Sequence, residues 1–247
     1  MAKIKLSVVI PAYNEEKNLN KGSLEEVYDY LSEQNYGYEV LVVDDGSSDK
    51  TVEKVEQIIK NKKSFALIKN EHGGKAITVM TGLLKADGEI VLFTDLDQST
   101  PLKEIEKFFP EFDKGFDVVI GQRQGRKGAP PIRRLYSIGF SILRNIVLGL
   151  PFSDTQCGFK AFTNEAVNKI FPQLLERWEK NKTQGAAVNA GWDIETLFLA
   201  KKRGLKITDI EVEWHYVGSE RVGMKAALEA LKDTFRIRVS DLTRKYN

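Results

Sequence analysis

Short apolar runs rich in β-branched residues alternate with longer amphipathic stretches over the first half of the chain. The apolar runs predict buried strands at residues 6–10, 39–43, 65–68, 90–93 and 118–120. The stretches between them predict helices at residues 16–32, 50–60, 76–85 and 102–109. This alternation is typical of an α/β fold with a mostly parallel sheet flanked by helices, in which ligands bind at the carboxyl ends of the strands.

The pattern changes after Gly121. Residues 121–153 contain no acidic residue and six basic ones, which are Arg123, Arg126, Lys127, Arg133, Arg134 and Arg144. This segment includes a loop at 125–131 and a predicted apolar helix at 132–148, a combination typical of a membrane-surface element. The remaining pattern predicts a short strand from Phe159, helices at 165–171 and 193–203, a strand at 206–212 and a closing helix at 224–242. Since no linker or repeat interrupts the chain, we expect residues 1–247 to form a single domain.

The composition is that of a folded protein, because 42% of the 247 residues are hydrophobic and 29% are charged. The single cysteine excludes an intramolecular disulfide. A formal net charge of +2 gives no support to a nucleic-acid partner, and we expect none. The sequence has no apolar run of the ~18 residues that a spanning helix needs and no signal-peptide pattern, so we expect a cytoplasmic protein.

Two acidic clusters follow predicted strands. Asp44 and Asp45 follow the second strand, and Asp95 and Asp97 follow the fourth, where the two-residue alternation of a strand would aim both carboxylates the same way. Paired carboxylates with few basic neighbours form a hard oxygen site for Mg²⁺ or Mn²⁺, which bind through carboxylates and substrate phosphates. The alternatives are a turn with a helix cap for the first cluster and a helix entry for the second.

Other nucleotide-binding and catalytic signatures are missing. No G-x-G-x-x-G motif follows the first strand, and Gly73-Gly74-Lys75 lacks the spacing of a P-loop, which disfavours dinucleotide oxidoreductases and P-loop ATPases. With one cysteine and two histidines, a structural zinc site is disfavoured as well. We expect His72 and His215 to be surface or strand residues, and Cys157 to pack as a small apolar residue.

Three motifs resemble, in order and spacing, the signature series of inverting family 2 glycosyltransferases, which have the GT-A fold. They are Val8-Val9-Ile10-Pro11-Ala12-Tyr13-Asn14-Glu15, Val43-Asp44-Asp45-Gly46-Ser47-Ser48-Asp49-Lys50-Thr51 and Asp95-Leu96-Asp97. Motifs in the second half resemble the polyprenyl-phosphate branch, and within it the dolichyl-phosphate glucosyltransferases. They are Arg134-Leu135-Tyr136-Ser137, Asp154-Thr155-Gln156-Cys157-Gly158-Phe159-Lys160, Gly191-Trp192-Asp193-Ile194-Glu195 and Gly218-Ser219-Glu220-Arg221-Val222. The resemblance spans about residues 6–222, but we expect no N-terminal membrane anchor of the kind usual in that branch, and Arg221 replaces a common lysine.

The resemblance implies a donor site in the first half of the chain. Residues of the first motif would line the base and ribose pocket, Asp44 or Asp45 would contact the nucleoside, and Gln98 would border the sugar. Asp95 and Asp97 would be catalytic, because they would hold Mg²⁺ or Mn²⁺ on the donor diphosphate. The expected nucleotide-sugar residues, in the half formed by residues 1–121 and just beyond it, are Pro11, Ala12, Tyr13, Glu15, Asp44, Asp45, Lys75, Gln98 and Arg123.

The resemblance also implies an acceptor site in residues 122–247. We expect Arg134, Ser137 and Arg221 to bind the acceptor phosphate, since arginine forks pair with phosphate oxygens. The alternative for this basic stretch is a solvated surface. Asp193 is the third catalytic candidate: a hydroxyl acceptor needs such a base, an anionic phosphate does not, and a helix N-cap is the alternative.

These expectations combine into an inverting transferase that moves a hexose from a nucleotide sugar to a polyprenyl or dolichyl phosphate. The enzyme would bind peripherally at the cytosolic face of a membrane. UDP-glucose is the first choice of donor, and GDP-mannose, as in a dolichyl-phosphate mannose synthase, or an N-acetylhexosamine donor stays open. The rivals are a soluble family 2 enzyme that glycosylates a polysaccharide or protein hydroxyl, and a nucleotide-sugar-binding protein without turnover, which the acidic pair at residues 95 and 97 disfavours.

Overall fold

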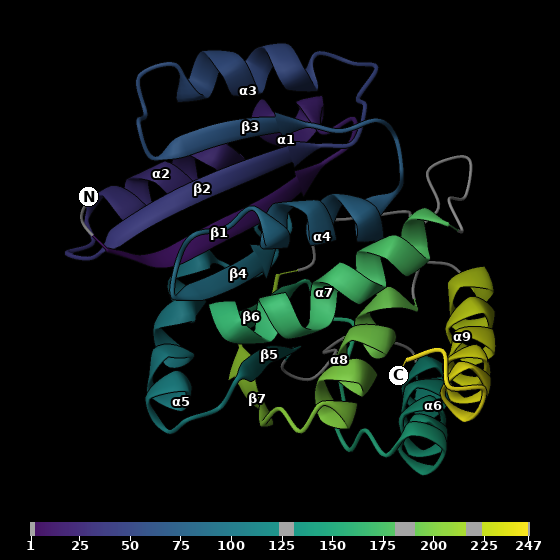
Figure 1. Ribbon diagram of the computed structural model, residues 1–247. Coiled ribbons are helices and arrows are strands. Elements are labelled where there is room, and N and C mark those ends of the chain that lie inside the picture. The colour runs from purple at the N-terminus through teal and green to yellow at the C-terminus, as the bar shows by residue number, and fades with distance from the viewer. Residues whose placement is uncertain (1–2, 124–130, 181–190, 216–223, 247) are drawn as a thin grey trace.

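A single sheet with helices on both faces organises the part of the chain that the structure describes (Figure 1). The computed structural model describes residues 3–123, 131–180, 191–215 and 224–246, and at 131–138 and 224–230 it describes the backbone alone. The strands are β1 (Ile4–Ala12), β2 (Gly37–Asp44), β3 (Phe65–Lys69), β4 (Ile90–Thr94), β5 (Val118–Arg123), β6 (Phe159–Thr163) and β7 (Ile207–Val212). The helices are α1 (Glu16–Leu19), α2 (Ser23–Ser32), α3 (Thr51–Ile59), α4 (Lys75–Leu84), α5 (Phe109–Asp113), α6 (Pro131–Leu148), α7 (Asn164–Glu179), α8 (Trp192–Lys202) and α9 (Met224–Leu242), with a 3-10 helix at Leu102–Lys107.

The strand order in the sheet is β3-β2-β1-β4-β6-β5-β7. β1 pairs in parallel with β2 and β4, β2 with β3, and β5 with β7. β6 lies between β4 and β5 and is antiparallel to both. The predicted mostly parallel α/β sheet is therefore confirmed. Because β6 runs in reverse, its amino end lies at the same edge as the carboxyl ends of β1, β2, β4 and β5.

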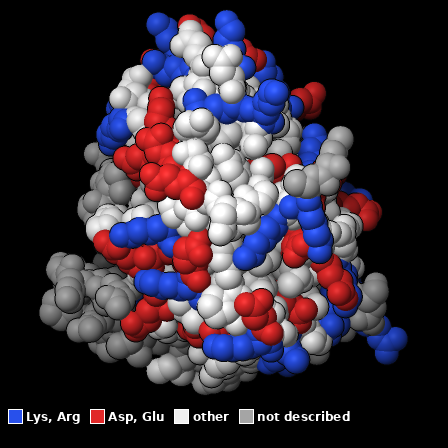
Figure 2. Space-filling view, turned by 90° about the vertical axis from the view of Figure 1, so that its left-hand side faces the viewer, with Lys and Arg blue, Asp and Glu red and all other residues white. Residues whose placement is uncertain are grey.

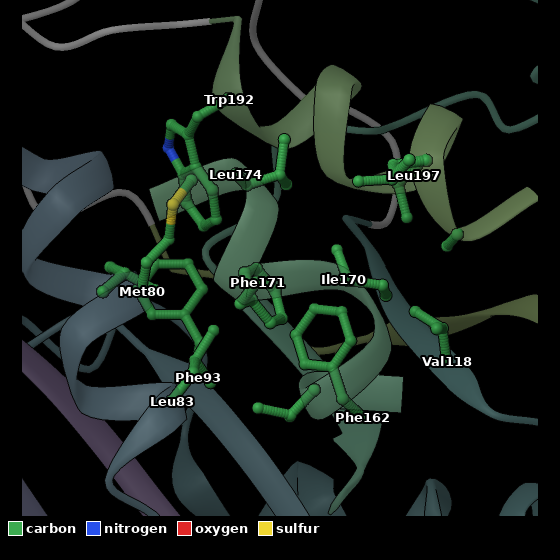
Figure 3. Packing of buried hydrophobic residues seen from close by; sticks show 14 of the residues in the cluster. Met80, Leu83, Phe93, Val118, Phe162, Ile170, Phe171, Leu174, Trp192 and Leu197 are labelled. Carbon is green, nitrogen blue, oxygen red and sulfur yellow. The ribbon is translucent and has the colours of Figure 1, made fainter. Parts of the chain in front are cut away.

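Buried side chains that alternate along the strands build a core on each face of the sheet. Val8 and Ile10 pack toward the face that α2, α3 and α5 cover, whereas Val9 and Phe93 pack toward α4, α7 and α8. In this second core, which Figure 3 shows, the ring of Trp192 meets the ring of Phe93 edge to face with 5.5 Å between centroids. The contact fixes the start of α8 against the end of β4.

Three predicted helices differ from the structure in extent. The helix predicted at 16–32 is divided into α1 and α2 by Gly22, whose φ of 85° lies in the left-handed region. The helix predicted at 102–109 is a 3-10 helix followed by α5. The helix predicted at 165–171 continues as α7 to Glu179, with Pro172 inside it.

The face from which β1 and β2 start carries charges of both signs. Figure 2 shows Lys and Arg side chains interspersed with Asp and Glu over the described part of this face. The two acidic clusters of the sequence lie at the opposite edge, because both follow the carboxyl ends of strands. The residues that the sequence predicts to bind the nucleotide sugar and the metal ion therefore lie at that edge.

Candidate active site

Hydrogen bonds join the loops that follow β1 and β2. The Asn14 N–H donates to Ser47 Oγ over 3.0 Å, and Asn14 Oδ1 accepts from the Ser48 N–H over 2.8 Å. Asn14 has a φ of 53°, which asparagine adopts more readily than most residues. The Glu15 N–H donates to Thr51 Oγ1 over 2.8 Å. The first two sequence motifs therefore form one continuous surface at the carboxyl edge of the sheet.

Asp44 is buried at the end of β2 and has one unpartnered oxygen. Its Oδ2 accepts from the N–H groups of Gly46 and Ser47 over 3.0 and 3.1 Å. Its Oδ1 is buried without a hydrogen-bond partner. Because an unpaired buried acceptor is costly, this oxygen is suited to accept a hydrogen bond from a ligand. The turn requires Gly46, which has a φ of 73°.

Asp45 joins the second motif to the loop before α4. Its Oδ1 and Oδ2 accept from the N–H groups of Gly73 and Gly74 over 2.8 and 3.0 Å. The Nδ1 of His72 lies 3.0 Å from Asp45 Oδ2, and the His72 ring stacks on the Tyr13 ring with 4.6 Å between centroids. Asp45 thus holds the loop before α4, and the stacked rings lie at the same edge of the sheet as Asp44.

Asp95 and Asp97 lie in a turn after β4, since Thr94 is the last residue of the strand. The two-residue alternation of a strand therefore does not apply to this pair. Asp97 Oδ1 accepts from the Ser99 N–H over 2.9 Å and from Ser99 Oγ over 2.7 Å. Gln98 has a φ of 49°, and its Nε2 donates to the Asp95 carbonyl oxygen over 2.9 Å. The turn geometry, set by these bonds, orients the two carboxylates.

The space around Asp95 fits a divalent cation site. A Cβ at Gly158 would lie 2.0 Å from Asp95 Oδ2, so only glycine leaves room for this carboxylate. Among the described residues, no group of three or more His, Cys, Asp or Glu side chains could hold a metal ion. Two carboxylates are enough for Mg²⁺ or Mn²⁺ when substrate phosphates supply further oxygens. The donor set at Asp95 and Asp97 fits such an ion.

Lys75, the first residue of α4, brings a positive charge to the acidic pair. Its Nζ donates to Asp95 Oδ1 over 2.6 Å. Burial alone would lower the pKa of this ammonium, but the carboxylates of Asp95, Asp193 and Asp97 outweigh burial and raise it. Lys75 therefore stays charged, as a phosphate-binding role requires.

Asp193 lies in the first turn of α8, paired with a buried lysine. Gly191, not Asp193, is the N-cap of this helix, so the N-cap alternative is wrong. The Nζ of Lys160, on β6, is 2.5 Å from Asp193 Oδ1. Burial raises the pKa of Asp193, and the ammonium groups of Lys160 and Lys75 oppose that rise.

Two arginines of the basic stretch have partners within the protein. Arg123 Nε and Nη2 donate to the Asp154 carboxylate over 2.6 and 2.8 Å. Burial alone would raise the pKa of Asp154, but the Arg123 guanidinium lowers it below its ordinary value. Arg144 is buried and donates to Thr155 Oγ1 and to the Phe152 carbonyl oxygen. Arg123 and Arg144 are therefore bound within the protein rather than solvated charges.

The remaining expected residues fall in less well described parts of the chain. Arg134 and Ser137 lie on α6 where the backbone alone is described, and Arg221 lies outside the described residues. Sequence reasoning missed His72, Lys160 and Asp154. A lysine inside the apolar run of β6 was the available signal for Lys160.

Comparison with known proteins gives a family, relatives and a shared fold. A family model for glycosyl transferase family 2 matches residues 7–171. The chain is 32% identical over 252 residues to a dolichyl-phosphate beta-glucosyltransferase of Trichomonas vaginalis, which covers 96% of this chain and 74% of the relative. It is also 32% identical over 265 residues to the dolichyl-phosphate beta-glucosyltransferase of Homo sapiens, covering 96% and 76%. Among solved structures, glucosyl-3-phosphoglycerate synthase from Mycobacterium tuberculosis in complex with UDP matches with a TM-score of 0.67 at 18% identity, over 96% of this chain and 80% of that one.

Proposed function

The chain belongs to glycosyl transferase family 2 and is a glycosyltransferase with the GT-A fold, and from that membership we propose that it transfers glucose from UDP-glucose to a polyprenyl phosphate such as dolichyl phosphate. The names of the relatives support both the sugar and the lipid acceptor. Their similarity extends over nearly all of this chain, which includes the half where the acceptor is expected to bind.

The arrangement of Asp95, Asp97 and Lys75 carries this proposal. A nucleotide sugar with its base near Tyr13 and Asp44 would have its diphosphate at this point along the edge of the sheet. Asp95 and Asp97 would hold Mg²⁺ or Mn²⁺ there, and the bound ion would supply positive charge to the diphosphate leaving group. Lys75 would supply a further positive charge from the start of α4.

A uridine base fits the unpartnered oxygen of Asp44. Uracil presents a single ring N–H between two carbonyl groups, whereas guanine presents a ring N–H and an adjacent amino group. The two adjacent donors of guanine pair best with both oxygens of one carboxylate, but Asp44 Oδ2 already accepts two backbone N–H groups, which leaves Oδ1 for the single ring N–H of uracil. We therefore prefer UDP-glucose to GDP-mannose as the donor.

The transfer proposed is a single in-line displacement. A phosphate oxygen of the lipid attacks the anomeric carbon of glucose and forms the new C–O bond. The bond from that carbon to the diphosphate oxygen breaks, and its electron pair leaves with UDP. No proton has to move, because the attacking oxygen is already anionic. Attack from the opposite side converts an α-linked donor into a β-linked product.

The acceptor phosphate is proposed to bind in the half formed by residues 122–247. Arg134, Ser137 and Arg221 are the residues we assign to it. Arg123 stays in the donor set of the proposal, with its guanidinium oriented by Asp154. Residues 1–121 would then bind the nucleotide sugar, so the reacting groups would meet between the two halves.

A membrane contact through α6 and α9 would bring the enzyme to its lipid acceptor. These helices lie side by side at one end of the molecule (Figure 1). The exposed large hydrophobic residues of the described chain all lie on them, and are Ile142, Ile146, Phe235, Val239 and Leu242. No described helix is long and apolar enough to cross a bilayer. We propose peripheral binding at the cytosolic face of a membrane.

Co-sedimentation with anionic liposomes tests this contact. Burying two aliphatic side chains is worth roughly 3 kcal/mol, so replacing Ile146 and Leu242 together by Ser should lower binding more than tenfold. Neutralising Arg126, Lys127 and Arg133 should reduce binding at low salt, by about 1 kcal/mol each. The control is Gln57→Ser, because Gln57 is an exposed residue of α3, outside the proposed contact, and its replacement should leave binding unchanged. Binding that none of these changes affects would contradict the membrane contact.

The donor and product are tested directly. Thermal shifts with Mn²⁺ and a panel of nucleotide sugars should single out UDP-glucose, since a ligand at 100 times its dissociation constant adds about 2.7 kcal/mol of stability. The lipid product should carry a β-linked glucose by NMR. Stabilisation by GDP-mannose alone would refute the donor, and an α-linked product would refute the single displacement.

A further inference from the structure

Lys160 is a fully buried ammonium without an assigned role. It lies inside β6 between Phe159 and Ala161, and pairs in register with Phe93 of β4. Its Nζ contacts the Cys157 carbonyl oxygen and lies 2.5 Å from Asp193 Oδ1. A buried charge is costly unless it is paired. Lys160 therefore favours an ionised Asp193 beside it, because a neutral Asp193 would leave the ammonium without its ion-pair partner.

Stability gives little reason for this ion pair. Replacing a buried ion pair by apolar side chains of similar volume is often neutral or stabilising. The strand neighbours of Lys160 would suit an apolar side chain at this position, because Phe159 and Ala161 are both buried. The ion pair is better explained by a function of the Asp193 carboxylate at the edge of the sheet.

Four charged groups of alternating sign connect the core to the expected metal ligand. Lys160 pairs with Asp193, and the positive charge of Lys75 also acts on Asp193. Lys75 in turn donates to Asp95 over 2.6 Å. Each carboxylate therefore has a cation beside it, and Lys75 links Asp193 electrostatically to Asp95, the expected ligand of the metal on the diphosphate.

The ion pair with Lys160 makes the Asp193 carboxylate a good hydrogen-bond acceptor and opposes the rise in its pKa that burial causes. Protonation of Asp193 would break its ion pair with Lys160. An anionic acceptor phosphate would be repelled by Asp193, whereas a sugar hydroxyl would donate to it. The group next to the diphosphate in a nucleotide sugar is the hexose, which carries such hydroxyls.

We propose that Lys160 is a positioning residue that fixes the Asp193 carboxylate as a hydrogen-bond acceptor for a hydroxyl of the transferred hexose, and that Asp193 takes no proton in the reaction. The inference rests on the proposed transfer to a phosphate acceptor, which needs no base. It gives Lys160 an indirect role in the choice of sugar. It also removes general base from the roles left open for Asp193.

A double-mutant cycle tests whether Lys160 acts through Asp193. We expect Lys160→Met to lower kcat by roughly 100-fold, since a displacement of about 1 Å can have that effect. In an Asp193→Asn background the same change should lower kcat by less than a few fold, because the group that Lys160 orients is already altered. The affinity for UDP, measured by calorimetry, should stay the same in all four proteins. Lys160→Arg should restore part of the lost activity.

Sugar selectivity supplies a readout that a structural role would not change. The ratio of kcat/KM for UDP-glucose to that for UDP-galactose should fall in Lys160→Met and in Asp193→Asn. Lys202→Met is the matched control. Lys202 also forms an ion pair with a carboxylate, since its Nζ lies 2.6 Å from Asp241 Oδ1, but this pair is not part of the candidate site. Its turnover and selectivity should equal those of the wild type.

Two results would overturn the proposal. Equal losses of kcat from Lys160→Met in both backgrounds would make Lys160 an independent structural residue. A loss of about 10²-fold or more from Asp193→Asn, with unchanged selectivity, would make Asp193 a general base. The second result does not depend on Lys160→Met folding, and thermal unfolding of each variant identifies any that fails to fold.

Failure of the proposed function is a separate outcome. If the wild type transfers glucose to a hydroxyl acceptor and not to polyprenyl phosphate, the proposed acceptor is wrong. The cycle can then be run with that hydroxyl acceptor, and coupling between Lys160 and Asp193 is still measured.

Discussion

Gly158→Ala should inactivate the enzyme without unfolding it. The added Cβ would lie 2.0 Å from Asp95 Oδ2 and 2.8 Å from Asp95 Cγ, whereas ordinary contacts are about 3.5 Å. The Asp95 carboxylate must therefore move by roughly 1.5 Å, and a displacement of this size costs on the order of 100-fold in turnover. The backbone tolerates alanine, since Gly158 is not among the glycines with positive φ.

The assay for this prediction measures release of UDP from UDP-glucose at saturating Mn²⁺, alongside the thermal unfolding midpoint. Gly139→Ala is the control, because a Cβ at Gly139 meets no atom within 4 Å and the residue lies in helix α6. We expect both variants to unfold near the wild-type temperature and only Gly158→Ala to lose turnover. A folded Gly158→Ala enzyme with wild-type turnover would refute the argument that the position of Asp95 matters.

Four further predictions concern other parts of the molecule. Asp97→Ala should lower turnover by ~10²-fold or more with an unchanged unfolding midpoint, and activity within a few fold of wild type would leave Asp97 only a turn-forming role. Arg134→Ala should raise the KM for the lipid phosphate more than the KM for the donor, and the reverse change would move Arg134 to the donor site. Tyr246→Phe should lower the free energy of unfolding by roughly 1.5–3 kcal/mol, measured in urea, because the buried hydroxyl donates to the Glu195 carboxylate over 2.5 Å. Cys157 should resist alkylation at neutral pH until the chain unfolds, because burial raises the pKa of its thiol to about 11, and rapid labelling of the folded protein would contradict this.

The strands were predictable from the sequence because a strand that is buried on both faces has a continuous run of apolar residues. β1 to β5 each contain the predicted segment and extend it by up to three residues at an end. The helix predicted at 16–32 failed at Gly22, where a left-handed backbone interrupts an otherwise amphipathic pattern. Periodicity alone also could not distinguish the 3-10 helix at Leu102–Lys107 from an α-helix, since both place apolar residues three apart.

The site residues that follow the ends of strands were predictable from the sequence. The ion pairs that depend on tertiary contacts were not. Asp44 and Asp95 could be assigned to one edge because parallel strands end together. The pairing of Arg123 with Asp154 and of Asp193 with Lys160 could not be predicted, because each pair joins residues about thirty positions apart that only the folded chain brings together. A lysine in an apolar strand signals a buried partner, but the sequence does not say which carboxylate that partner is.

The dependence of UDP release on a lipid phosphate tests the central claim most directly. UDP-glucose and Mn²⁺ are incubated with the enzyme, with and without a polyprenyl phosphate, and UDP and lipid-linked glucose are both quantified. The account predicts that rapid UDP release requires the metal and the lipid phosphate, and that one lipid-linked glucose forms for each UDP released. Release that is unchanged by the lipid phosphate, or that proceeds equally well with a polyprenol lacking the phosphate, would contradict it.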